Sequence, residues 1–289
     1  MSHLFCFGFG YSAKALAVRL LEQGWRVTGT CRTGEKAEAL EAQGITPLLF
    51  DGTAPIANLA GHLGSDAHIL VSVPPDADGD PVMRLHGEEL AAQASRIPWL
   101  GYLSTTGVYG DRQGEWVDET SSLTPTTRRG RYRLRAERQW VRISSHRGVP
   151  VQIFRLAGIY GPGRNQLVRI RQGTARRIVK PGQVFSRIHV DDIAQVLQAS
   201  IGRPATGRAF NLCDDLAAPP EEVISFAAGL LGLPEPPAVA FEDAELSDMA
   251  RSFYAESKRV RNERIKRELG VELLFPTYRE GLRALVDDV

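Results

Sequence analysis

The sequence has little cysteine, no excess of charge of either sign and no long apolar run. Its 289 residues include three cysteines, Cys6, Cys31 and Cys213, an odd number without metal-ligand spacing, so we expect neither a disulfide framework nor a zinc site. Thirty-five lysines and arginines against 34 acidic residues leave a net charge of +1, which argues against a nucleic-acid or membrane-surface partner. No stretch approaches the roughly twenty apolar residues of a membrane span. We therefore expect a cytoplasmic protein without a bound metal.

The length and composition fit a globular protein with a sizeable core. Hydrophobic residues make up 43% of the chain and charged residues 24%, which is ordinary for such proteins. A chain of 289 residues suffices for one large domain or for two coupled lobes, and it contains no internal repeat.

The first twenty residues contain the strongest local pattern. Residues 4–7 form a short apolar run that predicts a strand buried on both faces, and residues 13–21 carry apolar side chains at helical spacing. Between them the chain follows the pattern G-x-G-x-x-A, with Gly8, Phe9, Gly10, Tyr11, Ser12 and Ala13. In a dinucleotide site the first glycine makes the turn, the second admits the pyrophosphate, and the small third residue allows close helix packing. A tight turn without a ligand is the alternative, and the strand and helix on either side favour the nucleotide.

The end of the next expected strand indicates which nucleotide binds. Residues 26–31 form this strand, and Arg32 and Thr33 follow it. An acidic residue here would hold the ribose hydroxyls of NAD, whereas an arginine suits the 2′-phosphate of NADP. We therefore predict NADP rather than NAD as the cofactor, with a solvated loop arginine as the alternative interpretation of Arg32.

Strands and helices alternate beyond this point. Strands are expected at 46–50, 68–72 and 99–103 and helices at 35–43 and 81–96, which predicts an α/β fold with a parallel, doubly wound sheet. Ligands of such sheets lie at the carboxyl ends of the strands. Asp51, Ser72 and Val73 fall there and are predicted to contact the cofactor. Near the other end of the chain, residues 257–269 and 277–286 are predicted to form two helices.

Five motifs occur in the order typical of one family. They are Ser104-Thr105-Thr106-Gly107-Val108-Tyr109-Gly110-Asp111, Asp118-Glu119 followed by Pro125, and the segments 155–164 (RLAGIYGPGR), 187–194 (RIHVDDIA) and 210–212 (FNL). Together they resemble the extended short-chain dehydrogenase/reductases, the NAD(P)-dependent epimerase/dehydratase group. The resemblance implies a Rossmann-type nucleotide-binding domain at 1–160 plus 186–212. It also implies a smaller, substrate-facing C-terminal lobe at 161–185 plus 213–289.

The same resemblance locates an active site that departs from the family pattern. In the family a Ser or Thr at the position of Thr105 binds the substrate, and a Tyr-x-x-x-Lys pair on the next helix transfers the proton. Aligned from Pro125 without a gap, the tyrosine position is Arg129 and the lysine position is Arg133. Arginine remains protonated at any accessible pH, so Arg129 cannot serve as the acid or base. Thr106 stands where the dehydratases of the family carry an acid, which disfavours sugar dehydration.

Several replacements for the missing tyrosine remain open. Tyr132 lies one helical turn from Arg129 and can supply a phenol, while Asp80 is either an alternative base or the N-cap of a helix that begins at Pro81. Arg129 and Arg133, together with Thr106, are predicted to bind an anionic substrate, with helix-surface charge as the alternative.

Two functions follow from this altered site. One is an NADP(H)-dependent oxidoreductase or epimerase acting on a small anionic or nucleotide-sugar-like substrate. The other is an inactive NADP-binding sensor or scaffold. A monomer and a homodimer are both compatible with the sequence.

Overall fold

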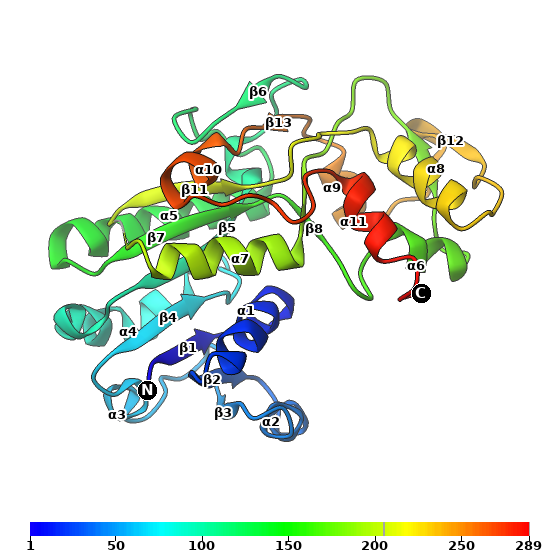
Figure 1. The fold of residues 1–289 in the computed structure, drawn as a ribbon. Coiled ribbons are helices and arrows are strands. Elements are labelled where there is room, and N and C mark those ends of the chain that lie inside the picture. Colours follow the sequence, from blue (N-terminus) through cyan, green and yellow to red (C-terminus); the bar gives the residue numbers. More distant parts are fainter. Residues whose placement is uncertain (205, 289) are drawn as a thin grey trace. The chain divides into compact units, whose positions relative to one another are not determined.

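The computed structural model describes residues 1–204 and 206–288. The chain divides into two compact units. Figure 1 labels their helices and strands along the chain. Their ranges are, for unit 1, Met1–Thr105, Arg128–Arg155 and Ile193–Phe210, and, for unit 2, Thr106–Thr127, Leu156–Asp192 and Asn211–Val289. In the part of the chain that is described, no helix combines the length and apolarity that crossing a bilayer requires.

Unit 1 is built on a seven-stranded sheet with the order β11-β7-β5-β4-β1-β2-β3. The strands from β3 to β5 run parallel. This order confirms the doubly wound α/β fold predicted from the sequence. The strands are β1 (His3–Phe7), β2 (Arg26–Cys31), β3 (Thr46–Leu49), β4 (Ala67–Val71), β5 (Leu100–Thr105), β7 (Val151–Leu156) and β11 (Arg208–Leu212).

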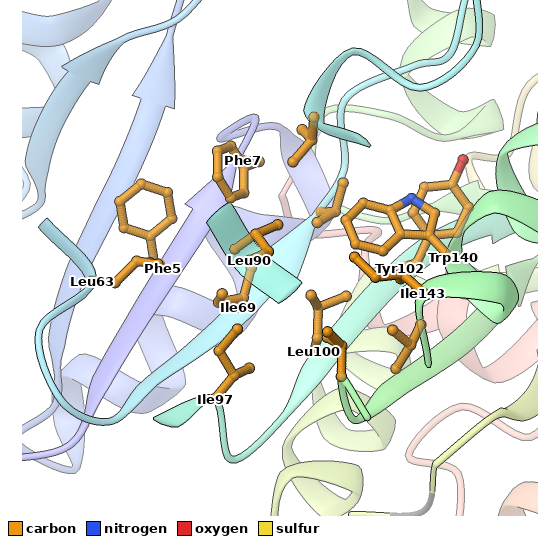
Figure 2. Packing of buried hydrophobic residues seen from close by; sticks show 14 of the residues in the cluster. Phe5, Phe7, Leu63, Ile69, Leu90, Ile97, Leu100, Tyr102, Trp140 and Ile143 are labelled. Atoms are coloured by element: carbon orange, nitrogen blue, oxygen red, sulfur yellow. The ribbon is translucent and has the colours of Figure 1, made fainter. Parts of the chain in front are cut away.

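Helices cover both faces of this sheet, which is why all five residues of β1 are buried. On one face Phe5 and Phe7 pack with Ile69 and Leu100, and Tyr102 lies against Trp140 with ring centroids 5.8 Å apart (Figure 2). The helices of unit 1 are α1 (Tyr11–Glu22), α2 (Gly34–Glu41), α3 (Leu59–Leu63), α4 (Pro81–Ala92), the 3₁₀ turn η1 (Ala94–Arg96), α5 (Arg128–Arg147) and most of α7 (Val190–Ile201).

Unit 2 consists of short elements around a smaller apolar core. Three two-stranded sheets pair β10 with β8, β12 with β9 and β13 with β6. The core contains Tyr160, Leu167 and Tyr278. The strands are β6 (Trp116–Val117), β8 (Gly158–Tyr160), β9 (Arg177–Val179), β10 (Arg187–His189), β12 (Ala238–Ala240) and β13 (Arg259–Val260). The helices are η2 (Thr106–Tyr109), α6 (Gln166–Arg171), α8 (Pro220–Leu230), η3 (Phe241–Asp243), α9 (Asp248–Phe253), α10 (Glu263–Leu269) and α11 (Tyr278–Ala284).

Long-range pairing changes two features expected from the sequence. The helix predicted from residue 257 begins only at Glu263, because Arg259 and Val260 pair with β6 instead. The segment 106–127, which lies inside the predicted nucleotide-binding range, belongs to unit 2. Its β6 pairs with β13, and Thr126 Oγ1 donates a 2.7 Å hydrogen bond to Glu256. The functional roles of the two predicted domains stay a prediction.

Two histidines lie near the amino-terminal ends of neighbouring strands β1 and β4. His3 is fully buried, and its Nε2 lies 2.9 Å from Thr28 Oγ1. Burial, together with the charge of Arg26, lowers the pKa of His3 from its usual value of 6.5, and burial also lowers the pKa of His68. The folded protein therefore keeps both rings neutral at pH values where the unfolded chain already binds protons.

We expect the free energy of unfolding to fall as the pH is lowered from about 7.5 to about 5.5. For a histidine with a depressed folded-state pKa, the stabilisation is fully present above the unfolded value and is lost as the pH falls below it. Each unit of pKa shift is worth about 1.4 kcal/mol. Urea denaturation at both pH values tests this, because His3→Gln should show a weaker pH dependence than the wild type. An equal dependence in the two proteins would contradict the assignment.

Candidate dinucleotide site and active site

The turn between β1 and α1 is held in place by the two neighbouring strands. Gly8 has a φ of +82°, and its amide donates a 2.7 Å hydrogen bond to Thr30 Oγ1. Ser72 Oγ donates to the Gly8 carbonyl at 2.5 Å. A Cβ on Gly8 would lie 3.0 Å from Ser72 Oγ and 3.2 Å from Val73. The first glycine is therefore required by the backbone and by packing, before any ligand is considered.

Neither the backbone conformation nor the packing requires a glycine at position 10. Its φ of −99° and ψ of −166° are open to any residue, and a Cβ placed there meets no atom of the described chain within 4 Å. It precedes α1, whose first turn carries no acidic residue, and as a glycine it offers no side-chain cap to this helix. The positive end of this helix thus lies beside the space that a Cβ at Gly10 would enter, which is an arrangement that suits a phosphate group. Ser12 and Ala13 are buried against the sheet.

The residues predicted to contact the rest of the cofactor lie at the ends of β2 and β3. Arg32 is exposed and makes no hydrogen bond or ion pair within the described part of the chain. Thr33 begins α2, where its hydroxyl accepts the Lys36 amide at 3.3 Å. Asp51 is exposed, and its carboxylate accepts the Thr53 hydroxyl at 2.7 Å, which lowers its pKa. Both Arg32 and Asp51 are thus accessible to a ligand from solvent.

Helix α5 carries the two arginines at the tyrosine and lysine positions. Arg133 is half-buried: its Nη1 donates to Tyr102 OH at 2.9 Å and to the Leu103 carbonyl at 2.8 Å, and its guanidinium lies 5.5 Å from the Tyr102 ring centre. Arg129, one turn earlier, is exposed and has no partner among the described residues. Tyr132 is half-buried. Arg133 is therefore fixed against the end of β5 with its Nε and Nη2 still available, while Arg129 is free to move.

The two threonines of the predicted site fall in different units. Thr105 is the last residue of β5 in unit 1, and Thr106 is the first of η2 in unit 2, where its hydroxyl donates to the Leu156 carbonyl at 3.5 Å. Both side chains are partly exposed. The structure thus leaves both residues accessible, and their contact with a substrate stays a prediction.

Asp80 takes the capping role rather than that of an accessible base. One carboxylate oxygen accepts the amides of Val82 and Met83 at 2.9 and 3.1 Å, and the other accepts Trp140 Nε1 at 3.2 Å. The residue is fully buried, and burial raises its pKa. With both oxygens occupied and no exposed surface, Asp80 is not open to a substrate, because the carboxylate is used to begin α4.

Comparison with known proteins places this geometry in a family. The sequence model of the NAD-dependent epimerase/dehydratase family matches residues 88–213. Protein YeeZ of Escherichia coli (strain K12) is 31% identical over 276 residues, which cover 93% of this chain and 94% of YeeZ. The chain belongs to the NAD-dependent epimerase/dehydratase family.

Two solved structures extend the comparison to the whole fold of this family member. A functionally unknown conserved protein from Silicibacter pomeroyi DSS is 53% identical, with a TM-score of 0.91 and coverage of 100% of this chain and 99% of the other. The dTDP-glucose 4,6-dehydratase of Bacillus anthracis str. Ames, solved in complex with NAD, is 16% identical, with a TM-score of 0.77 and coverage of 99% and 96%. The second likeness concerns the fold alone.

A buried ion pair fixes the helix that carries the family's catalytic positions. Arg155 Nη2 on β7 donates to Glu137 of α5 at 2.8 Å, and the Ser104 hydroxyl of β5 donates to the same carboxylate. The side chains of Arg155 and Glu137 are 6% and 3% exposed. Ser104 and Arg155 both lie in the family motifs, which are the signal for this network in the sequence.

A second polar network lies within unit 2. The hydroxyl of Tyr109 donates to Asn211 Oδ1 at 2.7 Å, and the Asn211 amide donates to Glu119 at 2.8 Å. All three residues come from family motifs, and Tyr109 and Asn211 are fully buried. This network connects the η2 turn, the loop after β6 and the end of β11, so its observed role is structural.

Proposed function

We propose that this protein binds NADP(H) in preference to NAD(H) through unit 1 and uses it in an oxidoreductase or epimerase reaction. The observation that supports this most is the open space at Gly10 beside the start of α1. Gly8, Phe9, Gly10, Tyr11, Ser12, Ala13, Arg32, Asp51, Ser72 and Val73 are the proposed cofactor contacts. We further propose that residues 1–160 plus 186–212 act as the nucleotide-binding domain and that 161–185 plus 213–289 face the substrate.

The proposed chemistry uses an altered acid/base set. Arg129 and Arg133 stand in place of tyrosine and lysine, and neither can release a proton near neutral pH. Arg133 is held by Tyr102 OH and the Leu103 carbonyl, so it can present a fixed charge to an anion. Tyr132, on the same helix, is the proposed proton donor or acceptor. Thr105 and Thr106 are the proposed hydrogen-bond partners of a small anionic or nucleotide-sugar-like substrate.

A second candidate is an NADP-binding sensor or scaffold without turnover. The replacement of both members of the tyrosine and lysine pair favours it, whereas the intact glycine turn is common to both candidates. Measurement of NADPH consumption against a panel of carbonyl and sugar-nucleotide substrates separates the two. Turnover with any member of the panel would exclude the sensor.

The cofactor preference is tested at Arg32. NADPH should bind at least about tenfold tighter than NADH, a difference of roughly 1.4 kcal/mol, because the exposed guanidinium can pair with the 2′-phosphate. Calorimetry with both nucleotides should show that Arg32→Ala loses this advantage. Arg96→Ala, an exposed arginine after the far end of α4, is the matched control and should keep it. Equal affinity of the wild type for both nucleotides would refute the preference.

The arginine pair is tested by restoring the family residues. Replacing Arg129 with tyrosine and Arg133 with lysine should weaken the binding of an anionic ligand about tenfold or more, because two bidentate forks become a phenol and a point charge. The same variant should gain some hydride-transfer activity with NADPH. Unchanged ligand affinity in the double variant would show that the arginines serve only the helix surface.

A further inference from the structure

One face of the β8–β10 pair in unit 2 carries Arg187 and Tyr160, and each has polar atoms without a hydrogen-bond partner in the described chain. The parallel register sets Arg187 beside Gly158 and His189 beside Tyr160, so Arg187 and Tyr160 project from the same face. Gly158 carries no side chain beside the arginine, and a Cβ there would approach Arg187 Cγ to 3.7 Å. The register therefore places no β8 side chain directly beside Arg187.

The guanidinium of Arg187 is anchored through one nitrogen and lies over the Tyr278 ring, 6.0 Å from its centre. Its Nη1 donates to the carbonyls of Phe185 and Ala218 at 2.8 and 3.1 Å. Its Nε and Nη2 have no partner within residues 1–204 and 206–288, and the residue is partly exposed. The Nε–Nη2 edge is the one that meets a carboxylate with two parallel hydrogen bonds. Because Nη1 is fixed by the backbone, this edge is held in one orientation before any ligand arrives.

Two buried groups beside Arg187 also lack partners. Asp214 is 2% exposed; its amide donates to the Arg187 carbonyl at 2.6 Å, and its Oδ1 accepts the Leu216 amide at 3.3 Å. Its Oδ2 has no partner in the described chain and forms no ion pair with Arg187. Tyr160 is 7% exposed, and its hydroxyl is likewise without a partner there. Buried polar atoms are nearly always hydrogen-bonded, so such atoms indicate a missing ligand or water.

The charge on Asp214 decides which ligands Arg187, Asp214 and Tyr160 can bind together. Burial raises the pKa of Asp214 to about 8, against the opposing effect of Arg187. At neutral pH the side chain is therefore a neutral acid that donates a hydrogen bond through Oδ2. Together the three residues then offer one positive charge and two neutral O–H donors.

We infer that Arg187, Asp214 and Tyr160 bind the carboxylate of a small substrate, with the Nε–Nη2 edge of Arg187 as the principal contact. The biological role of this contact rests on the proposed function, in which the C-terminal lobe holds the substrate. One cation matches one negative charge, whereas a nucleotide diphosphate carries at least two and would require a second cation.

The pH dependence follows from the groups that surround Asp214. These are Arg187 on β10, Tyr160 on β8, Cys213, and the adjacent Asp215, which pairs with Lys266 of α10 at 2.5 Å. Above about pH 8 Asp214 ionises, and its negative charge should repel a bound carboxylate. Carboxylate binding should therefore weaken as the pH rises from 7 towards 9, and Asp214→Asn should remove this dependence while it keeps a hydrogen-bond donor.

Ligand binding to the full chain without dinucleotide tests the inference. Acetate and lactate are the carboxylate probes, inorganic phosphate and UDP are the competing probes, and binding is followed by ligand-observed NMR. We expect the carboxylates to bind with a Kd of the order of 1 mM and Arg187→Lys to weaken them tenfold or more, because lysine loses the fork. Arg267→Lys, at an exposed arginine of α10, is the matched control and should not change binding.

Three outcomes would overturn the inference. The first is carboxylate binding that is equal in Arg187→Lys and wild type, the second is no carboxylate binding at all, and the third is UDP or phosphate binding that is tighter and depends on Arg187.

Thermal unfolding of each variant shows whether it is folded. Tyr160→Phe, which removes only the hydroxyl, should weaken the binding of the carboxylates severalfold. Because the test needs no NADPH, its failure leaves the proposed cofactor site unaffected, and a failure of NADPH binding leaves this site intact.

Discussion

Gly10→Val should abolish dinucleotide binding and leave the free energy of unfolding unchanged. The backbone at Gly10 is extended, and a Cβ there meets no atom of the described residues, so valine fits the folded chain. Its branched side chain would fill the space in which the pyrophosphate approaches the helix. We expect the Kd for NADPH to rise more than about 100-fold, a loss of roughly 2.8 kcal/mol.

Fluorescence titration with NADPH and urea denaturation of the same samples check this result. Gly8→Ala is the matched control: alanine at a φ of +82°, with Cβ 3.0 Å from Ser72 Oγ, should cost about 1–2 kcal/mol of stability or more. Of the two glycines in this motif, Gly10 should thus matter for ligand binding and Gly8 for stability. A Gly10→Val protein that binds NADPH normally would remove the main support for the cofactor proposal.

Glu137→Ala should lower the free energy of unfolding by about 3–5 kcal/mol. The substitution removes the carboxylate that accepts from Arg155 at 2.8 Å and from the Ser104 hydroxyl, in a site where both ionic side chains are almost fully buried. The guanidinium of Arg155 would lose its counter-charge away from solvent. Such a cost is a large fraction of the stability of an ordinary domain.

Urea denaturation measures this loss, and an exposed ion pair provides the control. Glu88→Ala removes the partner of Arg147, whose Nη1 lies 3.4 Å from a carboxylate that is 90% exposed, and should cost less than about 1 kcal/mol. A double variant, Glu137→Leu with Arg155→Met, should recover much of the loss, because it leaves no unpaired buried charge. Equal destabilisation by Glu137→Ala and Glu88→Ala would show that the buried network adds no more to the free energy of unfolding than an exposed ion pair does.

The structure gives the two arginines of α5 different surroundings. Arg133 is bound by the end of β5 and can offer only a fixed edge, whereas Arg129 is exposed and without a partner in the described chain. An anionic substrate would therefore order Arg129 on binding and find Arg133 already in place. The inferred carboxylate contact at Arg187 belongs to unit 2.

The local sequence was sufficient for the first βαβ segment. The strand predicted at residues 4–7 is observed as His3–Phe7, the helix after the glycine turn begins at Tyr11, and the second strand occupies 26–31 as predicted. Each was predictable because the signal is contained in neighbouring residues: a continuous apolar run, helical spacing, and small residues where the chain turns. The family motifs then identified the fold of the remainder.

Contacts between residues far apart in the sequence decided the rest. Arg133 meets Tyr102 and Leu103, about thirty positions earlier, and Asp80 meets Trp140, sixty positions later. Residues 259–260 form a strand, although the sequence predicted a helix there, because β6 offers backbone partners. Side-chain identity determines which hydrogen bonds a residue can make. Only the folded chain determines which partner is within reach. The partners within reach make Asp80 a helix cap rather than a base, and they anchor Arg133 while Arg129 stays exposed.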